Sequence, residues 1–186
     1  SPKGLLIEEQ RTNLLTYSEQ FDNASWGKSN AAVTANSIAA PDGTVTADSV
    51  LNSAVSGQHY VFQNVSIAAN GTYTGSVYLK PLGGTASAVM WLLNAATADR
   101  AVVSLDFSTG VASASSAGGA AFTSVSATAT NVGNGWYRLT LTGTTTGGAI
   151  TLQQRIFPND ASTFTGDGTS GLYIWGAQLE AGGFAT

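Results

Sequence analysis

Aromatic and planar polar side chains recur in the segments of this chain that alternate apolar with polar residues. Flat aromatic rings can stack on the apolar face of a pyranose, and amide, ammonium or guanidinium groups can hydrogen-bond its hydroxyls. A surface that combines both kinds of side chain is therefore suited to binding a carbohydrate. The residues predicted to form such a surface are Tyr78, Lys80, Trp91, Trp136, Gln153, Arg155, Phe157 and Trp175.

Each of these residues also has a purely structural interpretation. Any β-sandwich carries outward aromatic side chains, and loops cover some of them. Trp91 and Trp175 could face either side of a sheet, and Trp26 is most simply a plug in the core or at an edge. The structural interpretation is the simpler one for a single residue, whereas the combined set points to ligand contact.

The residues that could support catalysis are few. His59 is the only histidine, and it lies in a strand-like run without the G-x-S-x-G turn that presents a nucleophilic serine. We therefore expect it to be a packed or edge residue. A histidine-rich metal site is impossible, and the absence of cysteine excludes a thiolate zinc site and a cysteine nucleophile.

Paired carboxylates are the other catalytic possibility, because glycosidases use two of them about 5 to 10 Å apart. The acidic residues here stand at turns or chain ends, where capping and turn formation explain them. We therefore predict that the protein is not an enzyme. The pairs weighed are Glu8 with Glu9, Asp99 with Asp106, and Asp160 with Asp167 and Glu180.

Charge is scarce along the 186 residues. Only 10% are charged, the net charge is -4, and the seven basic residues are scattered. Without a basic run to neutralise successive phosphates, neither a nucleic acid nor an anionic membrane surface is an expected partner. No apolar stretch approaches the about 20 residues of a membrane span.

The composition and length favour one all-β domain over residues 1–186. Long amphipathic helices need Glu, Lys, Arg and Leu on their faces, and this chain supplies few of them. Parallel α/β folds also need crossover helices of about a dozen residues, for which there is no amphipathic segment. We therefore predict antiparallel strands.

Period-two alternation marks these strands and their facing. Within 72–80, Val77 and Leu79 point to one face and Tyr78 and Lys80 to the other. Similar alternation separates the outward side chains in 136–142 and 149–157 from inward apolar ones. With about ten strands, the chain predicts a two-sheet antiparallel sandwich. The expected strands are 33–38, 45–51, 60–67, 72–80, 88–94, 101–107, 122–131, 136–142, 149–157 and 172–179, with 112–121 as a mobile hairpin tip.

The segment 13–26, NLLTYSEQFDNASW, resembles the opening of jelly-roll carbohydrate-binding modules of families four, nine and twenty-two. Those modules begin N-L-hydrophobic, followed by F-E or F-D and then W. In the same order, 72–80 resembles their T-Y-x-x-S-x-Y-x-K strand, 135–138 their W-x-R strand and 172–174 their last strand. The matches span nearly the whole chain and imply a jelly-roll sandwich that binds sugars.

A closer resemblance is to a domain that recurs in tailed-phage and prophage structural proteins, including tail and fibre proteins. Its motifs, which include R-T-N-L-L-x-Y-S-E, A-P-D-G-T-x-T-A-D, G-N-G-W-Y-R and T-G-D-G-T-S-G, occur here in series within 11–26, 40–48, 133–138 and 164–182. The resemblance implies a module excised from a longer polypeptide, with neighbouring domains, and an extracellular or virion-associated location.

The resemblance also bears on calcium. In the cellulosomal-type relatives the last strand reads Y-I-D-D-V-x-L, and its second Asp joins the acid of the first motif on a structural Ca²⁺. Here Gly176 stands at that place, which leaves Asp22 as the candidate ligand. The alternative, that Asp22 is a surface or turn-capping acid, stays open. We predict no other cofactor.

Together these features favour a non-catalytic module that binds a polysaccharide or cell-surface glycan. In the most specific form of this hypothesis, Tyr78, Gln153 and Arg155 line one site. The alternative is a purely structural or oligomerisation domain of a virion protein, whose exposed aromatic side chains pack against neighbouring subunits or domains.

Overall fold

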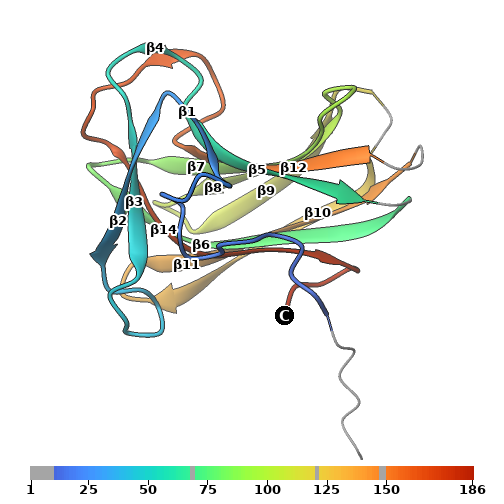
Figure 1. The fold of residues 1–186 in the computed structure, drawn as a ribbon, viewed down its shortest axis with the longest axis horizontal. Helices are drawn as coiled ribbons and strands as arrows, with labels where there is room; N and C mark the ends of the chain where they lie inside the picture. The colour runs from blue at the N-terminus through green and yellow to red at the C-terminus, as the bar shows by residue number, and fades with distance from the viewer. Residues whose placement is uncertain (1–10, 68–69, 120–121, 147–149) are drawn as a thin grey trace, which may run out of the picture.

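The computed structural model describes residues 11–67, 70–119, 122–146 and 150–186, which form two stacked antiparallel sheets (Figure 1). Sheet A contains, in spatial order, β1 (Gly27–Ser29), β5 (Tyr60–Ile67), β12 (Ile150–Pro158), β7 (Ser87–Asn94), β8 (Arg100–Asp106) and β9 (Val111–Ala117). Sheet B contains β10 (Phe122–Gly133), β11 (Trp136–Thr145), β6 (Gly71–Leu82), β14 (Gly171–Ala181), β3 (Ala47–Asn52) and β2 (Ala31–Ile38). A small third sheet pairs β4 (Ser56–Gly57) with β13 (Phe164–Thr165).

The predicted all-β sandwich of jelly-roll type is confirmed. Within the described ranges, no segment forms a helix of the length and apolar character that crossing a membrane would need. The core lies between the sheets, where the inward side chains of Val77 and Leu79 on β6 are fully buried with those of Met90 and Leu92 on β7. Burying each such side chain contributes roughly 1.5 to 3 kcal/mol to folding.

The segment from Arg11 to Trp26 closes one open edge of the sandwich. The Leu14 amide donates to the Leu179 carbonyl at 2.7 Å. The inward side chain of Gln63 accepts the Thr16 amide at 2.8 Å and donates to its carbonyl at 3.0 Å. This segment therefore joins β14 of sheet B to β5 of sheet A.

The same segment ends in two buried rings. Phe21 and Trp26 lie with centroids 4.6 Å apart, and the Trp26 indole N–H donates to the Tyr17 carbonyl at 3.0 Å. The prediction that Trp26 is a core or edge plug is confirmed.

The strand β9 corrects the interpretation of 112–121 as a hairpin tip. Residues Val111–Ala117 pair with β8 along its whole length, as the outermost strand of sheet A. Their small side chains are mostly exposed, so no apolar alternation marks the strand. Residues 120–121 lie outside the described part of the chain. The short strands β1, β4 and β13 were also not predicted.

A bulge interrupts β14 between Trp175 and Gln178. Gly176 at this bulge has φ of 59°, and a Cβ there would lie 3.2 Å from the Tyr78 ring. Both the left-handed backbone and the close approach favour glycine. The bulge thus explains why the place of the relatives' aspartate is taken by a residue without a side chain.

Candidate functional site

The register of sheet A lines up a row of side chains on its outer face, the side turned away from the core. Arg155 is the Cα partner of both Phe62 and Trp91, and Trp91 is the partner of Val102. Because neighbouring strands lie about 4.8 Å apart, this row spans about 14 Å across β5, β12, β7 and β8. The next row holds Asn64, Gln153, Leu93 and Arg100.

Arginine and aromatic side chains stack on this face. The Arg155 guanidinium lies 4.6 Å from the Tyr60 ring centroid and 5.7 Å from that of Trp91. Arg100 lies 4.4 Å from the Trp91 centroid. Phe157 packs against Trp91 at 4.5 Å and against Tyr60 at 5.0 Å between centroids. Cation–π contacts and ring packing thus hold the cluster together.

An amide pair orients Arg155. Gln153 Nε2 donates to Asn64 Oδ1 at 2.6 Å, and Arg155 Nε donates to Gln153 Oε1. Burial lowers the pKa of the Arg155 guanidinium, and the nearby charge of Arg100 lowers it further. The group still remains charged, since a guanidinium does not lose its proton in proteins.

A hollow of about 580 Å³ extends the same face toward β9. Its lining includes Ser104 and Ser113, which are register partners, and Asp106. Asp106 Oδ1 accepts the Ser108 amide at 2.7 Å and hydroxyl at 2.6 Å. These hydrogen bonds lower the pKa of Asp106, and the bond from the Ser108 hydroxyl has the largest effect. In Figure 1 the loops around β4 stand above one end of sheet A.

The outer face of sheet B is built differently. Trp136 points away from the main core but is 2% exposed, since it packs with Ala40 and Ala47 around the β2–β3 connection. The Trp175 indole N–H donates to Thr46 Oγ1 at 3.0 Å, and the Trp175 ring lies 5.3 Å from that of Tyr78. The rings of this face therefore form a second, smaller apolar cluster.

Two hollows lie beside this cluster on sheet B. One of about 440 Å³ is lined by Lys80, Trp136 and Tyr173 among others. Another of about 230 Å³ is lined in part by Tyr78 and Trp175.

The structure thus divides the predicted binding residues between two opposite faces. Tyr78, whose outward facing is confirmed, lies on sheet B, whereas Gln153 and Arg155 lie on sheet A. The hypothesis that these three line one site is wrong, because the hydrophobic core separates them. Sheet A carries Trp91, Gln153, Arg155 and Phe157, and sheet B carries Tyr78, Lys80, Trp136 and Trp175.

Sequence reasoning missed four residues of the sheet A face. Tyr60, Phe62 and Asn64 occupy alternate positions of β5, in a segment that was predicted to be a strand. Their alternation with buried Val61, Gln63 and Val65 was a usable signal. Arg100 begins β8 directly after a turn, where no pattern assigned it to a face.

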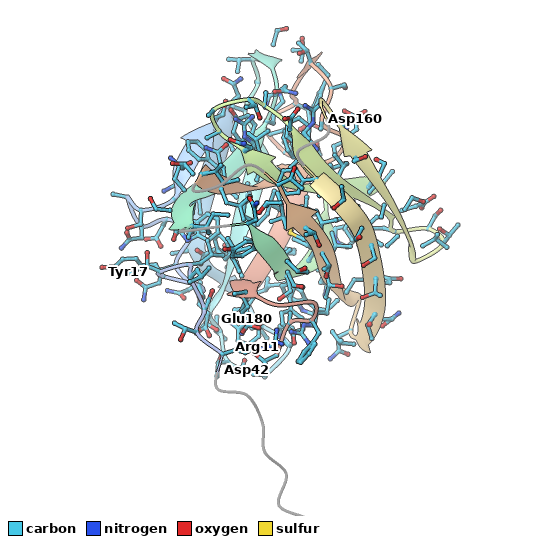
Figure 2. The ribbon with its side chains drawn as sticks, turned by 90° about the vertical axis from the view of Figure 1, so that its right-hand side faces the viewer. Arg11, Tyr17, Asp42, Asp160 and Glu180 are labelled. Carbon is cyan, nitrogen blue, oxygen red and sulfur yellow. The ribbon has the colours of Figure 1, made fainter. Side chains whose placement is uncertain are left out.

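The acidic residues accept hydrogen bonds in turns and near the C-terminal end of the chain. Figure 2 shows Asp160 at the opposite end of the molecule from Glu180. Asp160 Oδ1 accepts the Ser162 amide at 2.9 Å, whereas the buried Glu180 accepts the Thr186 amide and hydroxyl at 3.0 and 2.6 Å. Asp99 accepts the Thr97 hydroxyl at 2.8 Å. It lies about 20 Å along the strand from Asp106, too far for a catalytic pair.

The remaining catalytic candidates are His59 and the pair Glu8 and Glu9. His59 is fully buried, with Nδ1 2.7 Å from the Asn30 carbonyl oxygen and Nε2 3.2 Å from that of Phe164. The expectation of a packed histidine is confirmed. The pair Glu8 and Glu9 lies outside the described residues.

Asp22, the candidate calcium ligand, is exposed beside the buried Asp48. The two Asp48 oxygens accept the backbone amides of Phe21 at 2.7 Å and Asn36 at 2.9 Å. Burial raises the pKa of Asp48. No three His, Cys, Asp or Glu side chains of the described ranges converge as a metal-binding group. The residues present therefore do not form a ready carboxylate cage.

Comparison with solved structures finds chains of similar fold. No protein-family model matches the chain, and no curated protein matches it. The chain is similar to the structure of the Clostridium thermocellum N-terminal endo-1,4-β-D-xylanase 10B, CBM22-1 and GH10 modules, complexed with xylohexaose. The two share 12% identity with a TM-score of 0.50, over 95% of this chain and 28% of the other. This likeness shows the fold, a β-sandwich like that of a carbohydrate-binding module.

Proposed function

We propose that this protein is a non-catalytic carbohydrate-binding module whose outer face on sheet A binds a polysaccharide or cell-surface glycan. The observation that carries the proposal is the joint presence of Tyr60, Phe62, Gln153 and Arg155 on adjacent strands of one face. Half-buried rings provide surfaces for stacking, and the Arg155 guanidinium, held in place by the buried Gln153, provides hydrogen bonds to hydroxyls. The fold likeness to a structure of CBM22-1 and GH10 modules complexed with xylohexaose supports the same class of function.

The sheet A face is favoured over the sheet B face because of what occupies each. Both faces bury a predicted binding ring, Trp136 on sheet B and Phe157 on sheet A, and on sheet B the Trp175 indole N–H is also bonded to Thr46. On sheet A, Arg155 makes one side-chain hydrogen bond, to Gln153, among the described residues. A ligand on sheet A therefore meets unused donors.

Affinity electrophoresis through a panel of neutral and acidic polysaccharides tests this function. We expect retardation by at least one of them, and Phe62→Ala to weaken that binding about fivefold or more through loss of a stacking ring. Tyr173→Ala on sheet B is the matched control and keeps its retardation. Absence of retardation across the panel contradicts the proposal, as does an equal loss in both variants.

An origin in a phage or prophage structural protein, with an extracellular or virion-associated location, remains our interpretation of the serial motifs. The alternative function is a structural or oligomerisation domain of a virion protein. The hollow on sheet B lined by Lys80 and Trp136 favours it, as a place where a neighbouring subunit could pack. Light scattering tests the oligomerisation form of this alternative, which requires a stable oligomer.

Calcium at Asp22 is likewise a proposal that a melt can test. A ligand that binds the folded state alone raises the melting temperature, and the stabilisation grows with the logarithm of one plus ligand concentration over Kd. We expect added Ca²⁺ to raise the melting temperature of the wild type and to leave the melting temperature of Asp22→Asn unchanged. Equal melting temperatures of the wild type in Ca²⁺ and in chelator would remove calcium from the account.

A further inference from the structure

Two arginines cover the aromatic side chains in the middle of the sheet A face. Arg100 lies 4.4 Å and Arg155 5.7 Å from the centroid of the Trp91 ring, and Arg155 also covers Tyr60. Trp91 is 8% exposed. A neutral pyranose therefore cannot stack broadly on Trp91, since the surface above it is made of guanidinium groups.

These two guanidinium groups lack an opposite charge. Neither arginine forms a salt bridge with a carboxylate of the described residues. Arg100 Nη1 donates to the Ala98 carbonyl at 3.1 Å, and its buried Nε has no hydrogen-bond partner among the residues that the structure describes. Arg155 uses only Nε, toward Gln153, within the described part of the chain. The terminal amino groups of Arg155 are therefore available to a ligand.

Arg100 and Arg155 carry like charges and both lie at the Trp91 ring, so they repel each other in a partly desolvated environment. The two acids nearest to Arg100 along the chain offer little compensation. Asp99 accepts hydrogen bonds from Thr97 and the Gly119 amide, and Asp106 lies at the other end of β8 and is bonded to Ser108. An anionic group placed between Arg100 and Arg155 would relieve this repulsion and accept hydrogen bonds from the terminal amino groups of Arg155.

We propose, resting on the proposed function, that the glycan bound by sheet A carries an anionic group, and that Arg155 and Arg100 bind it. Arg155 presents its two terminal amino groups to the anion, and Arg100 adds the second charge. The rings of Tyr60 and Phe62 contact the sugar beside it. A uronic acid carboxylate and a sulfate ester share this chemistry.

Because the net charge of the protein is -4, the proposed preference for an anionic glycan arises from direct contact and not from long-range attraction. An acidic polymer is repelled by the protein as a whole and bound only where the two arginines meet it. The preference should therefore depend on these two side chains individually, and removal of a distant positive charge should leave it intact.

Matched polymer pairs test the proposal. Polygalacturonate is compared with its methyl ester, alginate and hyaluronan with their carboxyl-reduced forms, and dextran sulfate with dextran. Within at least one pair, we expect the acidic member to bind at least tenfold more tightly at about 0.1 M salt, where screening acts over about 10 Å. A preference within the first three pairs identifies a carboxylate, and one confined to the dextran pair identifies a sulfate.

Variants assign the preference to the arginines. Arg155→Gln and Arg100→Gln should each reduce it at least fivefold, with melting curves recorded for both. Arg138→Gln on the outer face of sheet B removes the same charge, and should keep the full preference. If Arg155→Gln does not fold, Arg155→Lys keeps the charge, loses the paired donors, and should still lower the preference.

The outcomes separate the two proposals. Binding of neutral and acidic members within twofold in every pair overturns the anionic ligand but leaves carbohydrate binding in place. Binding of no polymer contradicts the proposed function itself. Equal loss of preference in Arg138→Gln and Arg155→Gln overturns the site and indicates a general charge effect.

Discussion

The outer faces of sheets A and B carry similar kinds of side chain, yet these are engaged differently. On sheet B, Arg138 donates to the Thr186 carbonyl at 2.5 Å, and Trp136 and Trp175 pack around the β2–β3 connection. On sheet A, Arg100 and Arg155 lie over aromatic rings, and Arg155 donates one side-chain hydrogen bond, to Gln153, within the described residues. The difference teaches that outward facing alone does not identify a binding surface. What distinguishes the sheet A face is that two arginines reach one tryptophan ring, Arg100 and Arg155 at Trp91.

The largest expected effect comes from Trp136→Ala, which tests the structural role of the sheet B face. Removing this buried ring leaves a cavity beside Ala40 and Ala47, so we expect the free energy of unfolding to fall by about 3 to 5 kcal/mol. Urea denaturation followed by tyrosine fluorescence or circular dichroism measures it. A loss below about 1 kcal/mol would mean that the ring is dispensable to the fold and free for a ligand.

Asp48→Asn should have the next largest effect. Each Asp48 oxygen accepts a backbone amide, from Phe21 and from Asn36, and an asparagine can accept only one of them. The other amide then faces an NH₂ group, so we expect a loss of about 2 kcal/mol in the free energy of unfolding. The same denaturation experiment, with Asp42→Asn as an exposed control, measures it. Equal stability of Asp48→Asn and wild type would show that these hydrogen bonds contribute nothing.

Tyr78→Ala sharpens the comparison between the faces directly. Because Tyr78 packs on Trp175 and on Gly176, we expect a loss of about 1 to 3 kcal/mol in stability. Glycan affinity should stay within about twofold of wild type, since the ring lies on the opposite side from Arg155. A titration beside a thermal melt measures both. Weaker binding with an unchanged melt would return Tyr78 to the binding site.

The smallest effect concerns Asp167, in the loop that leads from β13 to β14. Backbone hydrogen bonds from Ser170 at 2.7 Å and Thr169 at 2.8 Å lower the pKa of Asp167 to about 2 from 3.8. Because the pKa of Asp167 is lower in the folded than in the unfolded state, the ionised carboxylate stabilises the fold at pH values above the unfolded pKa. This contribution is lost as pH falls from about 4 to about 2. Asp167→Asn should therefore melt slightly below wild type at pH 7 and equal to it near pH 2. A difference that persists at pH 2 would point to a cause other than charge.

The facing of the strands was predictable because alternation is local. The assignment of Val77 and Leu79 to the core, and of Tyr78 to the opposite side, needs only the period of two along β6. The sheet that each strand joins is not local information. That is why Tyr78 was grouped with Gln153 and Arg155, although β6 and β12 belong to different sheets.

The sequence also could not predict which outward side chains are covered by other segments. Nothing in the segment around Trp136 indicates that Ala40 and Ala47, about 90 residues earlier, pack on its outward ring. The edge strand β9 was missed because its mostly exposed Ala and Ser side chains show no apolar pattern. Of the sheet A site, the sequence indicated Trp91, Gln153, Arg155 and Phe157. The facing of Tyr60 and Phe62 could be predicted from alternation, but the strand register was needed to place them and Arg100 beside Arg155 and Trp91.

The four tryptophans allow the most direct test of which face binds, because each contributes one indole N–H signal to a ¹⁵N–¹H spectrum. The spectrum is recorded during titration with an oligosaccharide from the polymer that binds best. We expect the Trp91 signal to move with ligand concentration, and the signals of Trp26, Trp136 and Trp175 to stay in place. Movement of Trp136 and Trp175 with a stationary Trp91 would contradict the account and assign binding to sheet B.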